Sequence, residues 1–300
     1  MIRIICGPTA AGKSGVAMEL AARHGLTIVS ADSRQIYRGF DIGTAKPSRE
    51  ERQRVPHACI DVAGPTERWS AARWAADARR AIETAGVEKA VVVGGTGLYL
   101  KALTAPLFDE PELDAVRRGQ LAKHLEDWPL GRLRHWASTL DPARAHLGRT
   151  QLLRAIEMAL LTGRRLSAMH ESGGKPPAYR ARWLVVDPGD ELAHRIESRI
   201  DAMFDSGWVD EARELAKRVP EDAPAWQGCG YAAVRDIALR TAKLGDARTT
   251  ILVHTRQYAK RQRTWFRHQL AGAGAVTRLD PRANDADRLV RAWWDSEDDS

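Results

Sequence analysis

Short apolar runs alternate along the chain with segments in which apolar residues recur at helical spacing. The runs lie at residues 2–6, 27–30, 90–94 and 183–187, and Val276–Leu279 is a weaker fifth. Apolar runs of this length, separated by helical patterns, are typical of buried strands in a parallel sheet. The pattern therefore predicts an α/β fold, in which a parallel sheet carries helices on both faces.

One long segment lacks strand-like runs. From about Pro111 to Pro177 the pattern indicates consecutive helices. Pro106 precedes this segment and the glycine- and proline-rich residues 173–177 end it, and such residues often mark a boundary. We expect a core of residues 1–110 and 178–300, with an inserted all-helical lobe of residues 111–177 that moves to close over a substrate.

The first apolar run leads into residues 7–14, which match the spacing G-x-x-x-x-G-K-[ST] of a phosphate-binding P-loop. An amphipathic segment, Ser14–His24, follows, so the motif stands between a strand and a helix as it should. Loop amides and the positive helix end converge on an anion. The core is therefore expected to be P-loop NTPase-like. A phosphate or diphosphate would bind at Gly7, Pro8, Thr9, Ala10, Ala11, Gly12, Lys13 and Ser14, with Ser14 as a ligand of Mg²⁺.

Asp32 follows the second apolar run. The carboxyl end of a strand is where an open parallel sheet binds its ligands, so Asp32 is expected to face the contents of the P-loop. It would serve as a carboxylate on the metal side of a nucleotide kinase, or as a general base that takes a proton from an acceptor. An N-cap of a short following helix is a third interpretation.

Composition is compatible with a polyanionic partner but does not indicate one by itself. The 300 residues include 46 Lys and Arg against 39 Asp and Glu, for a net charge of +7. Arg256, Lys260, Arg263 and Arg267 recur at intervals of four, three and four, which places them on one helix face. Such a stripe contacts backbone phosphates in nucleic-acid-binding proteins, or is simply a solvated charged face.

The cysteines Cys6, Cys59 and Cys229 are not spaced as metal ligands and fit reduced thiols in a cytosolic protein. Structural zinc and disulfides are therefore not expected. Nothing resembles a signal peptide, and no apolar run approaches the ~20 residues that span a bilayer. We expect a cytoplasmic protein that does not contact membranes.

Residues 32–47 carry a more specific signal than the P-loop. Their sequence, DSRQIYRGFDIGTAKP, closely resembles the second motif of the tRNA dimethylallyltransferases. These isopentenyl-diphosphate:tRNA transferases modify the adenosine that is 3′-adjacent to the anticodon. Further matches follow in the family's order over most of the chain: Val55-Pro56-His57, Asp61, Val93–Tyr99, Arg154–Glu157 with Thr162-Gly163, Arg195-Ile196 with Arg199, Gly230-Tyr231 and Thr255–Gln262.

The resemblance implies a reaction and gives roles to residues that the patterns leave open. In this family the exocyclic amine (N6) of the target adenine attacks dimethylallyl diphosphate, and diphosphate leaves. By resemblance Asp32 is the base, while Lys13, the amides from Thr9 to Ser14, and Mg²⁺ on Ser14 hold the diphosphate. Arg199 resembles an additional clamp on the diphosphate, and Thr96 lies where its side chain would touch the adenosine. Residue type alone would also fit a solvated arginine and a threonine N-cap.

The implied partner is tRNA, bound through its anticodon stem-loop with the target base extruded. The inserted lobe would be the swinging tRNA-binding domain of the family, and the enzyme is expected to act as a monomer. Contacts to tRNA are implied for Asp32, Ser33, Arg34, Gln35, Thr96, Arg117, Gln151, Arg154, Gln227, Gly228, Cys229, Gly230 and Tyr231.

The sequence departs from the family pattern in two places. After Pro56-His57, many members have a second histidine, whereas this chain has Ala58-Cys59. Before Arg154, the family usually has an Asn-Asp pair and an arginine, whereas this chain has Leu147-Gly148-Arg149-Thr150-Gln151. Arg149 would then make some of the missing contacts, and the preference among tRNAs could differ.

Three other activities remain open. One is a P-loop kinase that uses ATP on a small metabolite or nucleotide, although Val91–Gly95 lacks the acid that would hold its Mg²⁺. The others are an RNA-binding module without catalysis and a transferase that acts on free adenine nucleotide.

Overall fold

The structure is a computed structural model that describes residues 1–105, 111, 113–171, 177–228 and 230–296. The chain forms two compact units. The first consists of Met1–Thr104 with Ala178–Ser300, and the second of Ala105–Pro177. The second unit begins earlier in the chain than the predicted start of the inserted lobe at residue 111.

The first unit is built on a parallel sheet. In the described part of the chain this sheet has six strands, in the order β3-β2-β4-β1-β5-β6. The five predicted runs are all strands, and the sequence pattern missed only the two-residue strand β3, which pairs with β2 at the sheet edge. The strands are β1 (Ile2–Cys6), β2 (Thr27–Ser30), β3 (His57–Ala58), β4 (Ala90–Gly94), β5 (Ala181–Val186) and β6 (Val276–Leu279).

The register brings the carboxyl ends of the central strands together. Cys6, the last residue of β1, pairs with Gly94, the last residue of β4. Ser30 at the end of β2 pairs with Val93 of β4. The loops after β1, β2 and β4 therefore start side by side, at the edge where open α/β sheets bind ligands. These are the loops that carry the predicted site.

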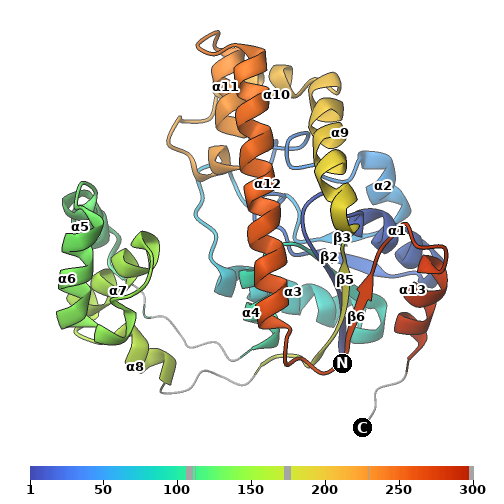
Figure 1. Ribbon diagram of the computed structural model, residues 1–300, viewed down its shortest axis with the longest axis horizontal. Helices are drawn as coiled ribbons and strands as arrows, with labels where there is room; N and C mark the ends of the chain where they lie inside the picture. The colour runs from blue at the N-terminus through green and yellow to red at the C-terminus, as the bar shows by residue number, and fades with distance from the viewer. Residues whose placement is uncertain (106–110, 112, 172–176, 229, 297–300) are drawn as a thin grey trace. The chain divides into compact units, whose positions relative to one another are not determined.

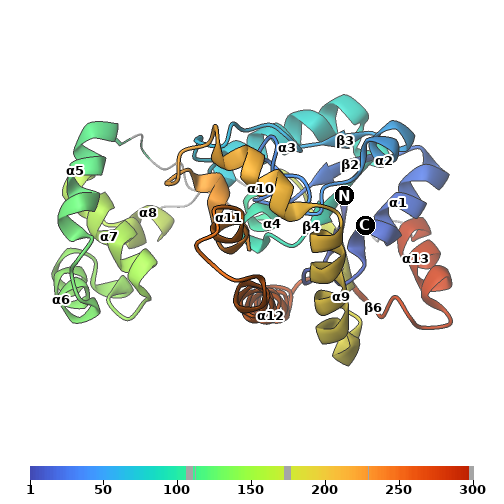
Figure 2. The ribbon, with the colours of Figure 1, turned by 90° about the horizontal axis from the view of Figure 1, so that it is seen from above.

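Helices cover both faces of the sheet, as predicted. Figure 2 shows α1 (Lys13–His24) and α13 (Ala286–Asp295) on one face, and α3 (Ala71–Ala85) and α4 (Gly97–Thr104) on the other. Each helix turns an apolar stripe inward. The residues so buried on α1 and α3 are Ala17, Met18, Leu20, Ala21, Trp74, Ala75, Ala78 and Ile82.

Trp74 anchors α3 and α4 beneath the end of β2. Its ring is fully buried and stacks on Tyr99 of α4, with the ring centroids 4.8 Å apart. Its Nε1 donates a hydrogen bond of 2.9 Å to the carbonyl of Ser30. A buried indole stabilises a core well when its N–H is paired. Because Ser30 ends β2, the contact also fixes the strand end that precedes Asp32.

Further helices follow β5 in the first unit. Figure 1 shows α12 beside α9, with α10 and α11 near the N-terminal end of α12. α12 also contacts α4. These helices are α9 (Leu192–Asp205), α10 (Trp208–Ala216), α11 (Tyr231–Ala238) and α12 (Leu244–Gln269). The short helix α2 (Arg49–Arg54) lies earlier in the chain, between β2 and β3. Short 3-10 turns lie at Val87–Lys89, Pro142–Arg144, Gly189–Glu191 and Pro224–Gln227.

The second unit is all-helical in the residues that are described. Its helices are α5 (Ala115–Leu125), α6 (Leu130–Leu140), α7 (Arg149–Thr162) and α8 (Leu166–Glu171). It has its own core, in which Leu125, Trp128, Leu133, Leu152 and Ile156 are buried against one another. The fully buried carboxylate of Asp141 accepts the amide and hydroxyl of Ser167, which ties α8 to the end of α6.

Across the residues that the structure describes, none of the helices combines the length and apolar character that crossing a membrane requires.

Candidate active site

The P-loop forms a tight cradle that only its glycines allow. Gly7 has φ 145°, and a Cβ there would lie 2.1 Å from the carbonyl oxygen of Val186 in β5. Gly12 has φ 99° and caps the start of α1. These conformations suit glycine, and they let the loop backbone curl around an anion at the end of the helix.

Lys13 reaches back over this loop. Its Nζ lies 2.6 Å from the carbonyl oxygen of Pro8, to which it donates a hydrogen bond. Burial, together with the nearby Arg199 guanidinium, lowers the pKa of Lys13 to about 8, although Asp32 acts in the opposite direction. Burial also lowers the pKa of Arg199, and Asp32 again opposes the shift. Two desolvated cations beside one carboxylate leave an excess of positive charge, which an anion would neutralise.

Asp32 is held in a fixed position at the end of β2. Its Oδ1 accepts the backbone amides of Arg34, at 2.8 Å, and Gln35, at 3.4 Å. The capping interpretation is thus correct for the contact, although the residues that follow form a turn and not a helix. A carboxylate tied down through one oxygen is pre-positioned to use the other in proton transfer.

One cavity gathers the predicted donor-site residues with an apolar wall. Thr9 and Ala10 of the P-loop, Asp32, Arg34 and Arg199 line its polar side. Its apolar lining comes from α9, α10 and α12 and consists of Ile196, Ile200, Met203, Trp208 and Ile251, and Thr255 and Tyr258 of α12 also line the cavity. A ligand that fits such a cavity has an anionic head and a short hydrocarbon tail.

Arg199 and the apolar wall belong to one face of α9. Ile196, Arg199, Ile200 and Met203 are spaced by three and four residues, so they share a helix face. Arg199 and Met203 also line a second cavity of about 740 Å³, together with residues of the segment 41–53, which includes most of α2. Arg199 therefore faces the interior and is not the solvated surface charge that its residue type also allowed.

Thr96 links the β4–α4 loop to the segment of Asp32. Its Oγ1 accepts the amide of Ser33 at 3.0 Å, and its own amide donates to the carbonyl of Ala31 at 3.2 Å. A Cβ on Gly94 would lie 2.2 Å from that same carbonyl oxygen, so the two loops are in close contact. The structure thus brings Thr96 and Asp32 together across two strand ends.

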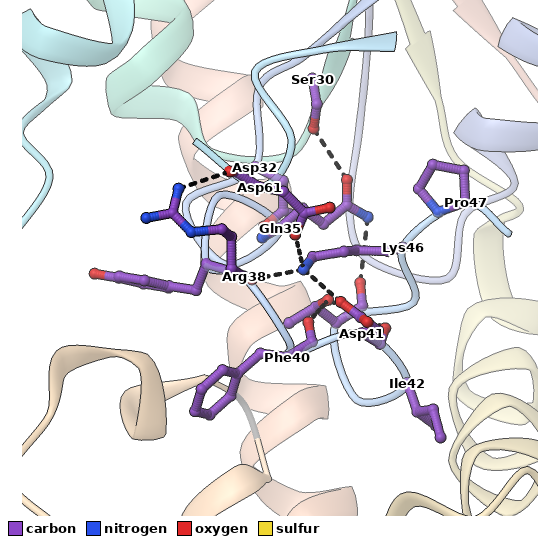
Figure 3. Close-up of polar contacts among 12 residues, drawn as sticks. Ser30, Asp32, Gln35, Arg38, Phe40, Asp41, Ile42, Lys46, Pro47 and Asp61 are labelled. Carbon is purple, nitrogen blue, oxygen red and sulfur yellow. Dashed lines mark hydrogen bonds and ion pairs between the residues drawn. The ribbon is translucent and has the colours of Figure 1, made fainter. Parts of the chain in front are cut away.

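The rest of the long motif, residues 32–47, forms a compact loop around the side chains of Gln35 and Lys46 (Figure 3). Gln35 accepts the Ser30 hydroxyl and donates to the carbonyls of Thr44 and Ala45. Both ends of its side chain are therefore engaged within the loop, which leaves the backbone and Arg34 to face the cavity.

Lys46 is a structural residue whose role the sequence pattern does not predict. Its side chain is 1 % exposed, and its Nζ donates to the carbonyl of Tyr37 and to the carboxylates of Asp41 and Asp61. Burial raises the pKa of Asp61, but hydrogen bonds from Lys46 and Arg52 outweigh it and lower that pKa overall. These contacts hold residues 37–46 in one conformation. The residues that form them are not regularly spaced in the sequence, so no sequence pattern predicts the contacts.

Tyr231, a predicted tRNA contact, has a fully buried side chain. Its hydroxyl donates to Glu211 at 2.5 Å and accepts the amide of Gly43 at 3.0 Å. Any contact to RNA at this position would thus come from the backbone of the loop. In that loop Gln227 is exposed, Gly228 is buried, and Gly230 has φ 95°, while Cys229 lies outside the described residues.

Arg117, Gln151 and Arg154 lie in the second unit. Arg117 is exposed on α5, and Gln151 accepts the amide of Gly148 at the start of α7. Arg154 pairs with Glu157. Arg149 donates to the carbonyls of Leu125 and Trp128 and so caps the end of α5. It is exposed, and its expected contact to tRNA stays a prediction.

The basic stripe of α12 is not a row of four free cations. Arg263 forms a two-pronged ion pair with Asp187, with its Nε 2.8 Å from the carboxylate, and Arg256 lies 3.7 Å from Glu197. Lys260 and Arg267 are exposed. Two of the four cations therefore form ion pairs with acids that are remote in sequence, and the other two are exposed.

For a metal ion at this site, the sequence predicts a single protein ligand, the hydroxyl of Ser14. The described residues contain no group of three or more His, Cys, Asp or Glu side chains that could hold one. Ser14 is exposed in the first turn of α1, beside the cradle. One hydroxyl plus diphosphate oxygens and water is an ordinary coordination set for Mg²⁺, which keeps waters and binds through phosphates.

Comparisons with known proteins agree with this geometry. A family model described as IPP transferase matches residues 35–269, and one described as isopentenyl transferase matches residues 1–67. The tRNA dimethylallyltransferase of Gloeobacter violaceus is 42% identical over 275 residues, 89% of each chain. That of Geobacter metallireducens is 43% identical over 279 residues, 88% of each chain.

Solved structures share the fold. A tRNA isopentenylpyrophosphate transferase from Bacillus halodurans aligns with a TM-score of 0.66 at 30% identity, over 97% of this chain and 94% of that one. A eukaryotic dimethylallyltransferase, crystallised in snapshots of its action on tRNA, aligns with a TM-score of 0.79 over 97% of this chain and 77% of that one. At 24% identity, this second likeness concerns the fold alone.

The fold and the cavity define a P-loop protein whose anion site adjoins an apolar wall. The chain belongs to the IPP transferase family, whose members include the tRNA dimethylallyltransferases. The predicted family and the predicted fold class are thereby confirmed.

Proposed function

We propose that this protein transfers the dimethylallyl group of dimethylallyl diphosphate to N6 of the adenosine 3′-adjacent to the anticodon of tRNA. The observation that carries the proposal is the cavity in which Asp32 and Arg199 lie beside an apolar wall. Lys13 of the adjoining P-loop is close enough to both for their charges to shift its pKa. An allylic diphosphate has an anionic head and a five-carbon tail, which match these two halves.

The donor head would lie on the P-loop. Loop amides, Lys13 and Arg199 neutralise the negative charge that grows as diphosphate departs, which is the main electrostatic demand of the reaction. When bound, Mg²⁺ would add further charge neutralisation, held by Ser14 and diphosphate oxygens. The tail would lie against Ile196, Ile200 and the other apolar side chains of the wall.

The acceptor would enter from the side of Asp32 and Thr96. N6 of adenine attacks the allylic C1, the bond between C1 and the diphosphate oxygen breaks, and diphosphate leaves with the electron pair. The substituted nitrogen then gives a proton to the carboxylate of Asp32, which its two backbone amides hold in place. Ser33 and Arg34, on the same turn, are positioned to contact the extruded nucleotide.

The tRNA would be held by both units. Exposed arginines of the second unit, among them Arg117, Arg132 and Arg134, suit the phosphates of an anticodon stem-loop. Gln227 and its neighbours would contact the loop from the first unit. We infer that one chain is sufficient, so that the enzyme acts as a monomer.

The kinase alternative lacks an essential part. A P-loop kinase usually places an acid for Mg²⁺ at the end of a second central strand, but β4 ends at Gly94 and Gly95 follows it. A Cβ at these positions would lie 2.2 Å from the Ala31 carbonyl and 2.3 Å from Nε2 of Gln262, so no side chain fits there.

The test is transfer of radiolabel from dimethylallyl diphosphate to unmodified tRNA with Mg²⁺, with and without ATP. Label that enters tRNA without ATP supports the proposal. Absence of transfer to tRNAs that read codons beginning with U, together with ATP consumption in the presence of a small acceptor, would establish the kinase instead.

A further inference from the structure

Gln262 joins the two loops that the proposed donor and acceptor sites depend on. It lies in α12, and its side chain is 6% exposed. Its Oε1 accepts the amide of Thr9 in the P-loop at 2.8 Å, and its Nε2 donates to the carbonyl of Gly95 at 2.9 Å. One partner can only donate and the other can only accept, so the bridge requires a side chain that does both.

The bridge is closely packed. A Cβ on Gly95 would lie 2.3 Å from Nε2 of Gln262 and 3.1 Å from the carbonyl oxygen of Gly7. Three residues later on α12, Trp265 packs against Gly97, where a Cβ would lie 2.4 Å from its ring. The β4–α4 loop thus packs closely against both the P-loop and α12, and Gln262 contacts both loops.

We propose that Gln262 is a positioning residue that sets the P-loop relative to the β4–α4 loop, and thereby the donor relative to the acceptor. The proposal rests on the proposed function, in which the P-loop holds the diphosphate and Thr96 lies on the acceptor side. Because displacements of about 1 Å between reactants can reduce the rate about 10²-fold, this bridge would govern turnover more than affinity. It also commits the Thr9 amide to Gln262, and the Ala11 amide donates to the carbonyl of Pro8, so the anion cradle would be formed by the other amides of the loop.

Gln262→Glu provides the most specific test. A carboxylate can accept from the Thr9 amide but cannot donate to the carbonyl of Gly95, and it adds a negative charge near the diphosphate. A protonated carboxyl donates and accepts as the amide does. Burial raises the pKa of a glutamate, so lowering the pH from about 8 to about 6 should restore the bridge progressively.

The experiment compares wild type, Gln262→Glu, Gln262→Met and the control Gln257→Glu, which puts the same charge on an exposed position of α12. We measure thermal unfolding, kcat and KM for dimethylallyl diphosphate, and calorimetric binding of inorganic pyrophosphate. Each quantity is taken at about pH 8 and about pH 6. Lys13, Asp32 and Arg199 are present in all four proteins, so the ratio of variant to wild type isolates the effect of Gln262.

We expect folded proteins in which kcat falls about 10²-fold for Gln262→Glu at the higher pH and recovers at least about tenfold at the lower pH. Gln262→Met should lose kcat equally at both pH values while it still binds pyrophosphate, and the control should match wild type.

A folded Gln262→Glu with wild-type kcat at the higher pH would overturn the proposal. So would a loss confined to KM, or a loss that Gln257→Glu shares. If wild type transfers no label to tRNA, the proposed function fails. Lower thermal stability of Gln262→Glu at the higher pH, with recovery at the lower pH, would then still support the bridge from Gln262 to the P-loop.

Discussion

The side chains of the donor site are two cations, Lys13 and Arg199, and one carboxylate, Asp32. Burial and the proximity of Arg199 lower the pKa of Lys13 to about 8. The charged form of Lys13 is therefore less stable in the free protein than in water, and a bound anion would stabilise it. The charges that the sequence placed far apart thus form one electrostatic unit.

This unit predicts how donor affinity depends on pH. Lys13 is charged below about pH 8 and loses its proton above it, so affinity for the diphosphate should fall as the pH rises. KM for dimethylallyl diphosphate should rise by up to about tenfold per pH unit above that midpoint. Lys13→Arg, whose guanidinium stays charged, is the control, and its KM should remain flat to about pH 9.5. A pH-independent KM in wild type would show that Lys13 does not carry this affinity.

Replacing Arg199 should move that midpoint. The Arg199 guanidinium helps to lower the pKa of Lys13, so Arg199→Gln should shift the rise in KM to higher pH. The variant should also bind the donor more weakly and turn over about 10²-fold more slowly, since a cation is lost from the leaving-group site. Steady-state kinetics over the same pH range check both effects. An unchanged midpoint would mean that the two cations are not coupled.

At the scale of elements, the loop 41–44 is held by helices from the other end of the chain. Glu211 of α10 accepts the amides of Asp41 and Ile42, and it accepts the hydroxyl of Tyr231 in α11. Gly43 packs on Trp208, where a Cβ would lie 2.2 Å from the indole. The long motif thus depends on α10 and α11 for its conformation.

Tyr231→Phe should therefore destabilise the protein. The change leaves the Glu211 carboxylate and the Gly43 amide each without one partner, which costs about 1–3 kcal/mol of unfolding free energy. Urea unfolding measures it, with Tyr179→Phe, at a partly exposed tyrosine, as the matched control. Equal stability of the two variants would contradict the bracing role of Tyr231.

Local patterns predicted the elements, and long-range pairing decided most of what they missed. The buried strands and the P-loop can be recognised from a few consecutive residues, whereas β3 is two residues long and contains no apolar run. Gln262 and Thr9 are 253 positions apart, and Arg263 meets Asp187 across 76, so spacing could not reveal either pair. The position of Asp32 at the strand end was predictable because it follows from sheet topology.

At the scale of the whole molecule, the second unit is a separate compact body with its own core. If it binds tRNA through phosphates, Arg117→Ala should raise KM for tRNA a few-fold and reduce the salt dependence of binding by about one unit of slope. KM for the donor should not change. Filter binding at several salt concentrations checks this, with Arg288→Ala on α13 of the first unit as control. An unaltered slope would remove Arg117 from the interface.

The most direct test of the account is the transfer step itself in Asp32→Asn. The asparagine oxygen can still accept the amides of Arg34 and Gln35, so the turn should persist, but the base is gone. With saturating dimethylallyl diphosphate, Mg²⁺ and tRNA, we predict a single-turnover rate at least about 10²-fold below wild type, with unchanged affinity for tRNA and no loss of affinity for pyrophosphate. A wild-type rate in this variant would contradict the assignment of Asp32 and, with it, the mechanism proposed for the cavity.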